Sequence, residues 1–233
     1  MRGVKLCGVL LDLDGTLLDH EAAVGAALLR WLPTIGVEPD AGTRTLWATV
    51  QERHLEAWRA GLVTFQQQRR GRLRDFLAAL GTPCEDDGRL DTLFSGFLLM
   101  YEQSWAAYPD ARPALAAIRR AGLRTAVLTN GIEEQQTAKL ARIGLRDLAG
   151  PVYTAETLGL FKPDPAVFTE ACRRWGLAPE TVVSVGDRHD LDVLPARAAG
   201  LHAVHLDRPG TAPPGEAHRI GSLRDLPALL LPH

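Results

Sequence analysis

The chain is poor in several features that would place a sequence in a class at once. It has three cysteines in 233 residues, Cys7, Cys84 and Cys172, and no two of them have the C-x-x-C spacing of a zinc or redox motif. An odd number of distant cysteines gives no disulfide framework and favours a reducing compartment. No apolar run has the length of a membrane span, and the amino terminus lacks the cleavage region of a signal peptide. We therefore expect a cytoplasmic protein that has no membrane partner.

An excess of positive charge is also missing. The sequence has 26 lysines and arginines against 28 acidic residues, so no basic field would attract nucleic acid, and we expect no nucleic-acid partner. Neither G-x-G-x-x-G after a predicted strand nor G-x-x-x-x-G-K-[ST] occurs, which excludes the common dinucleotide and P-loop sites. Repeats and low-complexity tracts are absent. The composition, 46% hydrophobic and 23% charged, is that of a globular protein with a large core.

The most informative stretch that is present lies near the amino terminus, where an apolar run ends in acidic residues. Residues 9–11 read as a buried strand, and Asp12 and Asp14 follow it. Side chains at i and i+2 of an extended chain point to the same side, so the two carboxylates should extend together beyond the strand. Their repulsion needs a cation or a shared proton, and a hard divalent ion such as Mg²⁺ is the natural solution. An exposed acidic turn is the alternative, so the rest of the chain must decide.

The hydrophobic pattern divides the remaining sequence into two regions. We predict an all-helical region with helices over residues 20–32, 45–60, 64–80 and 87–105. Beyond residue 109, we predict strands at 125–128, 152–153, 182–185 and 203–206, which alternate with helices at 113–121, 133–143, 165–175, 191–199 and 223–231. This alternation predicts an α/β fold with a doubly wound parallel sheet, into which the helical region is inserted as a cap. The predicted domains are residues 1–18 with 107–233, and residues 19–106.

Polar residues follow the predicted strands at the edge where such a sheet builds its active site. Thr129 and Asn130 follow the second strand, Lys162 follows the third, and Asp187 and Asp192 follow the fourth. Each of these could be an ordinary turn or a solvated loop on its own. Together, at successive strand ends, they indicate a phosphoryl-transfer site in which a carboxylate acts as nucleophile and a metal and a lysine offset the phosphate charge. Hydroxyl and backbone N–H groups would hold the phosphate oxygens.

The same residues resemble the four motifs of the haloacid dehalogenase-like hydrolase superfamily, and the resemblance extends over essentially the whole chain. The motif D-x-D-G-T-L-x-D is present as residues 12–19, and the hydroxyl of the second motif is Thr129. The lysine of the third motif is Lys162, and G-D-x-x-x-x-D is residues 186–192. The helical insert is similar to the cap of the small-molecule phosphatases in this superfamily.

This resemblance implies a role for each acid. Asp12 would attack phosphorus and form an aspartyl-phosphate, and Asp14 would protonate the leaving oxygen and then activate water. Asp12, the backbone carbonyl of Asp14, and Asp187 would bind Mg²⁺, while Asp192 would lie next to these ligands without binding the metal itself. Family members that expel halide generally lack the acid at the position of Asp14, so dehalogenation is disfavoured. The implied function is Mg²⁺-dependent hydrolysis of a small phosphorylated metabolite.

The resemblance assigns Thr129, Asn130 and Lys162 to the phosphoryl group, with Thr129 and Lys162 also acting in catalysis. Two positions depart from the pattern of the family: Arg188 stands where serine or threonine is common, and Pro195 where glycine is common. These departures affect the loop beside the metal and leave the ligands themselves intact.

Three alternatives remain open at this point. A phosphomutase would share every catalytic residue, a receiver domain would also use strand-end acids on a shorter chain, and a non-catalytic phosphate-binding protein would keep the scaffold. The cap could close over the site and restrict it to small substrates. Weak candidates for cap residues that contact the substrate are Trp58, Arg59, Gln66, Arg69 and Arg70. The sequence gives no indication of the substrate's identity or of the oligomeric state.

Overall fold

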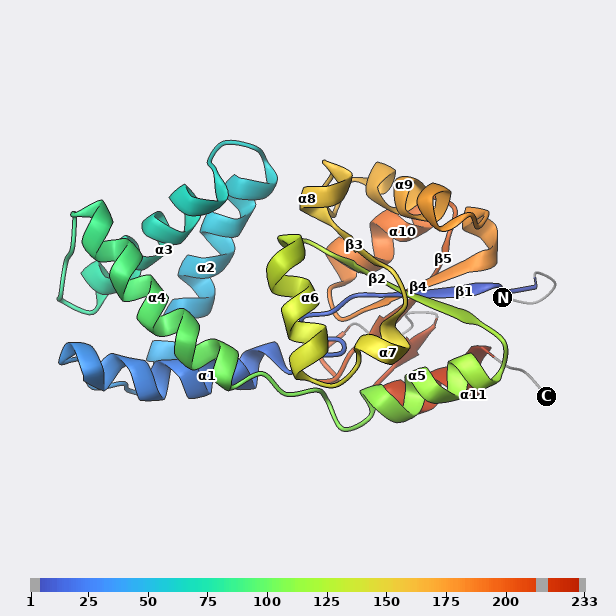
Figure 1. Ribbon diagram of the computed structural model, residues 1–233, viewed down its shortest axis with the longest axis horizontal. Helices are drawn as coiled ribbons and strands as arrows, with labels where there is room; N and C mark the ends of the chain where they lie inside the picture. Colours follow the sequence, from blue (N-terminus) through green and yellow to red (C-terminus); the bar gives the residue numbers. More distant parts are fainter. Residues whose placement is uncertain (1–4, 213–217, 231–233) are drawn as a thin grey trace. The chain divides into compact units, whose positions relative to one another are not determined.

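The computed structural model describes residues 5–212 and 218–230 and divides the chain into two compact units. One unit comprises the residues up to Asp19 together with those from Ala106 onward, and the other is His20–Trp105 (Figure 1). Among the described residues, no helix has both the length and the apolar character needed to cross a membrane.

The first unit, here called the sheet unit, is built on six parallel strands in the order β3-β2-β1-β4-β5-β6. These strands are β1 (Gly8–Leu11), β2 (Arg124–Thr129), β3 (Val152–Thr154), β4 (Val182–Gly186), β5 (His202–Leu206) and β6 (Arg219–Ile220). β1 lies between β2 and β4, with Leu11 opposite both Val127 and Val185. A central parallel strand is covered on both faces, which is why β1 reads as a continuous apolar run. The two-residue strand β6 is too short to leave a periodic pattern, and the sequence did not predict it.

Helices cover both faces of this sheet. They are α5 (Ala111–Arg120), α6 (Glu133–Arg142), α7 (Arg146–Ala149), α8 (Ala155–Leu158), α9 (Pro165–Trp175), α10 (Leu194–Ala198) and α11 (Leu226–Leu230). In Figure 1, α8, α9 and α10 cover one face, where Phe168 and Trp175 enter the core, and α5 and α11 cover the other. The predicted doubly wound parallel sheet is therefore confirmed. The end of the last predicted helix, residue 231, lies outside the described residues.

The segment predicted as one helix after residue 190 forms two elements instead. A π-helical turn, His189–Val193, precedes α10. Pro195 lies in the first turn of α10, where its missing N–H is not needed for an internal bond. The π turn closes through the backbone N–H of Leu194, which donates to the His189 carbonyl, and the N–H of Asp192 donates to the Arg188 carbonyl at 2.7 Å. Such turns are frequent at functional sites, and this one fixes the backbone beside Asp192.

The second unit, here called the helical unit, contains α1 (His20–Trp31), α2 (Thr43–Arg59), α3 (Phe65–Ala79) and α4 (Asp87–Gln103). The four helices correspond to the four predicted ones. Thr64 begins α3 with a capping box, in which its hydroxyl accepts from the N–H of Gln67 and the Gln67 side chain accepts from the N–H of Thr64. The core of this unit is aromatic, since the ring of Trp47 lies 4.4 Å from that of Phe97 and 4.9 Å from that of Phe76.

Candidate active site

A buried lysine joins two acids at the carboxyl ends of the strands. Asp12 follows β1 directly, and its Oδ1 accepts a hydrogen bond from Lys162 Nζ at 2.7 Å. The same ammonium group donates to Asp192 Oδ1 at 2.6 Å and to the Leu128 carbonyl at 3.1 Å. Only 3% of Lys162 is exposed. Burial alone would lower the pKa of Lys162, but the Asp12 and Asp192 carboxylates outweigh burial and raise it, so the lysine is a fixed positive charge.

A third acid completes a candidate metal site. Oxygen atoms of Asp12, Asp187 and Asp192 all lie within 4.8 Å of one another. Burial raises the pKa of Asp12 above its usual value, and Asp192 and Asp187 add to that effect while Lys162 opposes it. Burial and Asp192 likewise raise the pKa of Asp187 to about 6, against a hydrogen bond that Thr16 donates at 3.1 Å. Three acids around one lysine leave excess negative charge, and this oxygen-rich donor set fits a hard divalent cation such as Mg²⁺.

Two glycines leave the room that these acids occupy. Gly15 has φ +90°, and a Cβ built there would lie 2.4 Å from Asp187 Oδ2. A Cβ on Gly186 would lie 2.2 Å from Asp192 Oδ2. Any larger residue at either position would displace a carboxylate, so both glycines are part of the site.

Asn130 fixes the loop that carries Lys162. Its side-chain N–H donates to the Lys162 carbonyl at 2.7 Å, and its side-chain oxygen accepts from the Lys162 backbone N–H at 2.8 Å. These bonds engage both ends of the amide and leave it poorly placed to reach a phosphate. The assignment of Asn130 to phosphate binding therefore stays a prediction, while its contact with the loop is observed.

Asp14 has a different environment from Asp12. Both of its carboxylate oxygens accept hydrogen bonds from Lys139 Nζ at 2.7 Å, and Oδ2 also accepts from Gln136 Nε2 at 3.2 Å. The Gln136 amide donates to Thr129 Oγ1 as well, at 2.5 Å. Lys139 and Gln136 were not among the residues predicted from sequence. Their spacing was the one signal that could have indicated them. Residues at i and i+3 share one face of a helix, and α6 begins just after the turn that carries Thr129.

The weak candidates in the helical unit are mostly engaged within that unit. Arg59 pairs with Glu52 at 2.7 Å. Arg70 pairs with Asp91 and Asp87, and Gln66 donates to Asp91 at 3.1 Å. The remaining two candidates contact one aromatic ring: Arg69 lies 4.2 Å from the centroid of Phe65, and the Trp58 ring lies 5.0 Å from it.

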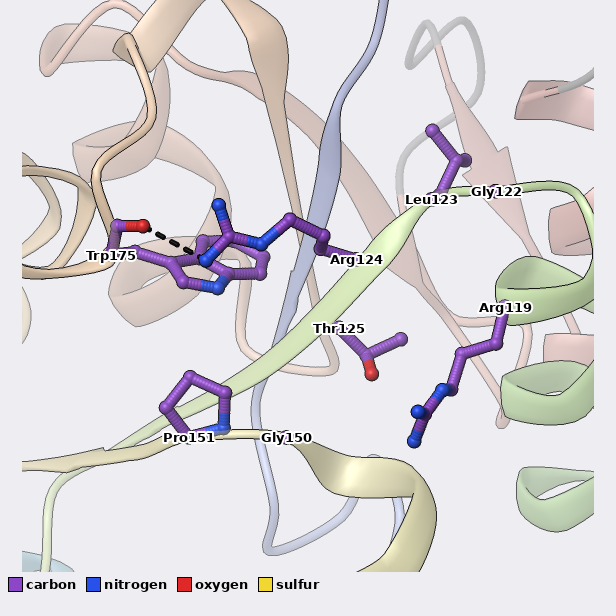
Figure 2. Close-up of a pocket in the computed structure, with 8 residues that line it drawn as sticks. All are labelled: Arg119, Gly122, Leu123, Arg124, Thr125, Gly150, Pro151 and Trp175. Atoms are coloured by element: carbon purple, nitrogen blue, oxygen red, sulfur yellow. Dashed lines mark hydrogen bonds between the residues drawn. The ribbon is translucent and has the colours of Figure 1, made fainter.

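A cavity of about 330 Å³ lies at the amino-terminal end of β2, the end opposite to the one that carries Thr129 (Figure 2). Arg124 is one of its lining residues, stacks on Trp175 at 5.2 Å and donates to the Trp175 carbonyl at 2.9 Å. The residues that line the cavity are Arg119, Gly122, Leu123, Arg124, Thr125, Gly150, Pro151 and Trp175. None of these lining residues is an acid, so the cavity has none of the groups assembled at the carboxyl ends of the strands.

A parallel sheet with these four groups of strand-end residues defines a class of hydrolases, and comparison with known proteins agrees. The family of haloacid dehalogenase-like hydrolases matches residues 8–200. The chain belongs to this family and is a hydrolase.

Its relatives include both phosphatases and dehalogenases. The chain is 34% identical to a phosphoserine phosphatase of Thermus thermophilus over 84% of this chain and 76% of that protein. It is 31% identical to (S)-2-haloacid dehalogenase 1 of a Pseudomonas species over 99% of this chain and 98% of that protein. Among solved structures, the magnesium-bound HAD-hydrolase YfnB of Bacillus subtilis has a TM-score of 0.86 with 21% identity, and covers 97% of this chain and 99% of its own. At that identity, the likeness concerns the fold alone.

Proposed function

We propose that the chain is a Mg²⁺-dependent phosphomonoester hydrolase that acts on a small phosphorylated metabolite in the cytoplasm. The observation that supports this most directly is the group of Asp12, Asp187 and Asp192 around the buried Lys162 ammonium. The phosphatases among the relatives also support this proposal.

In this proposal Asp12 is the nucleophile. Its carboxylate oxygen attacks phosphorus and the bond from phosphorus to the leaving oxygen breaks, which gives an aspartyl-phosphate. Lys162 and Thr129 hold the phosphoryl oxygens. Asp12, the backbone carbonyl of Asp14, and Asp187 would hold Mg²⁺, with Asp192 supporting them through Lys162. When bound, the cation would offset the repulsion between the acids and the phosphate.

Asp14 is the proposed general acid and base. It gives a proton to the leaving oxygen in the first step. In the second step it takes a proton from water while the water oxygen attacks phosphorus and the bond to Asp12 breaks, which releases inorganic phosphate. The same acid therefore serves both steps and ends in its starting state.

Dehalogenation is the second candidate, because two relatives that match nearly the whole chain are haloacid dehalogenases. A halide leaves as a stable anion and needs no proton donor, so Asp14 would have no role as an acid in that chemistry. The presence of Asp14 favours phosphate ester hydrolysis. A phosphomutase would keep Asp14 as well but would move phosphate within a sugar phosphate instead of releasing it.

The test is a panel of small phosphate esters and 2-haloacids, assayed for release of phosphate or halide with Mg²⁺ and after EDTA treatment. We expect phosphate release that EDTA abolishes and Mg²⁺ restores, and that Ca²⁺ supports poorly because its larger coordination shell misplaces the nucleophile. Asp12→Asn should abolish turnover, whereas Asp147→Asn, an exposed acid of the same unit, should not. Halide release, or turnover by a folded Asp12→Asn protein, would refute the proposal.

A further inference from the structure

Asp14 is held by two residues of α6 that belong to none of the four sequence motifs. Lys139 is only 3% exposed, and its Nζ lies 2.7 Å from each carboxylate oxygen of Asp14, which is 125 residues away along the chain. A bidentate contact of this kind restricts both the position and the rotation of the carboxylate. A surface ion pair between two mobile side chains would restrict neither.

Gln136 links Asp14 to the hydroxyl proposed to hold phosphate. Its Nε2 lies 3.2 Å from Asp14 Oδ2 and 2.5 Å from Thr129 Oγ1, and the residue is 2% exposed. Gly131 also packs closely against the Gln136 side chain, since a Cβ built on this glycine would lie 2.7 Å from it. Helix α6 therefore ties together the strand ends that carry Asp14 and Thr129.

We propose that Lys139 and Gln136 are positioning residues, and that Lys139 holds the Asp14 carboxylate in place for the step in which Asp14 takes a proton from water. This inference rests on the proposed function. Lys139 gives up no proton in this step: the water proton goes to Asp14, the water oxygen bonds to phosphorus, and the bond between phosphorus and Asp12 breaks. Without Lys139 the carboxylate can turn away from the water, so breakdown of the aspartyl-phosphate should slow the most.

The experiment compares Lys139→Met, Lys139→Arg and wild type with p-nitrophenyl phosphate in Mg²⁺. The p-nitrophenolate of this substrate is a good leaving group, so the first step needs little help from an acid. For Lys139→Met we expect kcat to fall about 10- to 100-fold with KM within about 2-fold of wild type. We also expect a burst of p-nitrophenol, and a phosphate adduct on the Asp12 peptide after acid quench. Lys139→Arg, which keeps the charge, should recover part of kcat.

The matched control is Arg142→Met, which removes one positive charge from the exposed side of the same helix and should change neither quantity. If Lys139→Met does not fold, the milder Lys139→Gln serves in the same assay. The inference is overturned if a folded Lys139 variant has wild-type kcat, loses activity only through KM, or loses kcat without accumulating the adduct. The proposed function fails separately, if wild type itself releases no phosphate from any ester.

Discussion

Lys162 shares one buried ammonium group between Asp12 and Asp192. Lys162→Met keeps the length of the side chain but leaves two buried acids without their cation. We expect it to lower the free energy of unfolding in EDTA by about 3–5 kcal/mol. Mg²⁺ should restore part of that loss, because a divalent ion can take over the same charge. Urea unfolding with and without Mg²⁺ measures both effects, and an unchanged midpoint in EDTA would contradict the ion-pair interpretation.

Asp187 supplies a pH dependence whose sign follows from its surroundings. Its pKa is raised to about 6 in the fold by burial and Asp192. The carboxyl group therefore favours the folded state when protonated, and this contribution is present below about pH 4 and lost as the pH rises through about 6. In EDTA, Asp187→Asn should be more stable than wild type by on the order of 2 kcal/mol at about pH 7, with no difference at about pH 4.

The measurement for Asp187 is the difference in unfolding free energy between the two proteins across that pH range. The difference cancels the titration of groups that do not interact with Asp187, so it reports this carboxyl group together with its effect on Asp12 and Asp192. Saturating Mg²⁺ should remove or reverse the advantage of the asparagine variant. A difference that stays constant with pH would mean that Asp187 is not the group that titrates.

At the scale of a helix, α3 carries a buried charge that costs stability. Arg72 is 8% exposed, and burial together with Arg69 lowers its pKa to about 9. Gln51 accepts from its Nη1 at 2.7 Å, whereas its Nε has no hydrogen-bond partner among the described residues. Its guanidinium lies 5.0 Å from the ring of Trp47 and 4.9 Å from that of Phe94, and the two contacts together recover about 4 kcal/mol, less than desolvation of the buried charge costs.

Arg72→Met should therefore raise the free energy of unfolding, by about 1–4 kcal/mol, because methionine fills the same aromatic space without a charge. The control is Arg70→Met at a partly exposed position of α3, where the arginine pairs with Asp91 and the same substitution should give no gain. Thermal and urea unfolding decide the matter. A less stable Arg72→Met would show that the stacking and the Gln51 bond outweigh burial of the charge.

Elements with strong apolar patterns were predictable, and contacts across the fold were not. The strands and the acids after them follow from local sequence, since a buried run and its end are adjacent in the chain. Lys139 was missed because on a single helix it looks like any solvated lysine, and only the packing of α6 brings it to Asp14. The amide of Asn130 is a similar case: the sequence indicates its place after β2, but its two bonds to Lys162 arise from a loop 32 residues away.

At the scale of the whole molecule, the helical unit is a single continuous insert between two parts of the sheet unit. The chain leaves and re-enters the sheet unit at neighbouring points, since the N–H of Asp19 donates to the Ala106 carbonyl at 3.0 Å and Leu18 pairs with Ala107. All the acids of the candidate metal site, and Lys162, Lys139 and Thr129, belong to the sheet unit. If the insert were removed, only a short linker would therefore be needed to join Asp19 to Ala106.

We expect a chain that joins Asp19 to Ala106 through two or three glycines to fold, because the cost of closing so short a loop is small and the sheet keeps its own core. Circular dichroism should show a cooperative transition, and Mg²⁺ should raise its midpoint, since the ligands are retained. Asp187→Asn in the shortened chain is the control and should abolish the Mg²⁺ effect. An unfolded or aggregated product would show that the sheet unit depends on the helical unit for its stability. If the shortened chain folds but Mg²⁺ has no effect, the metal site needs more than the sheet unit provides.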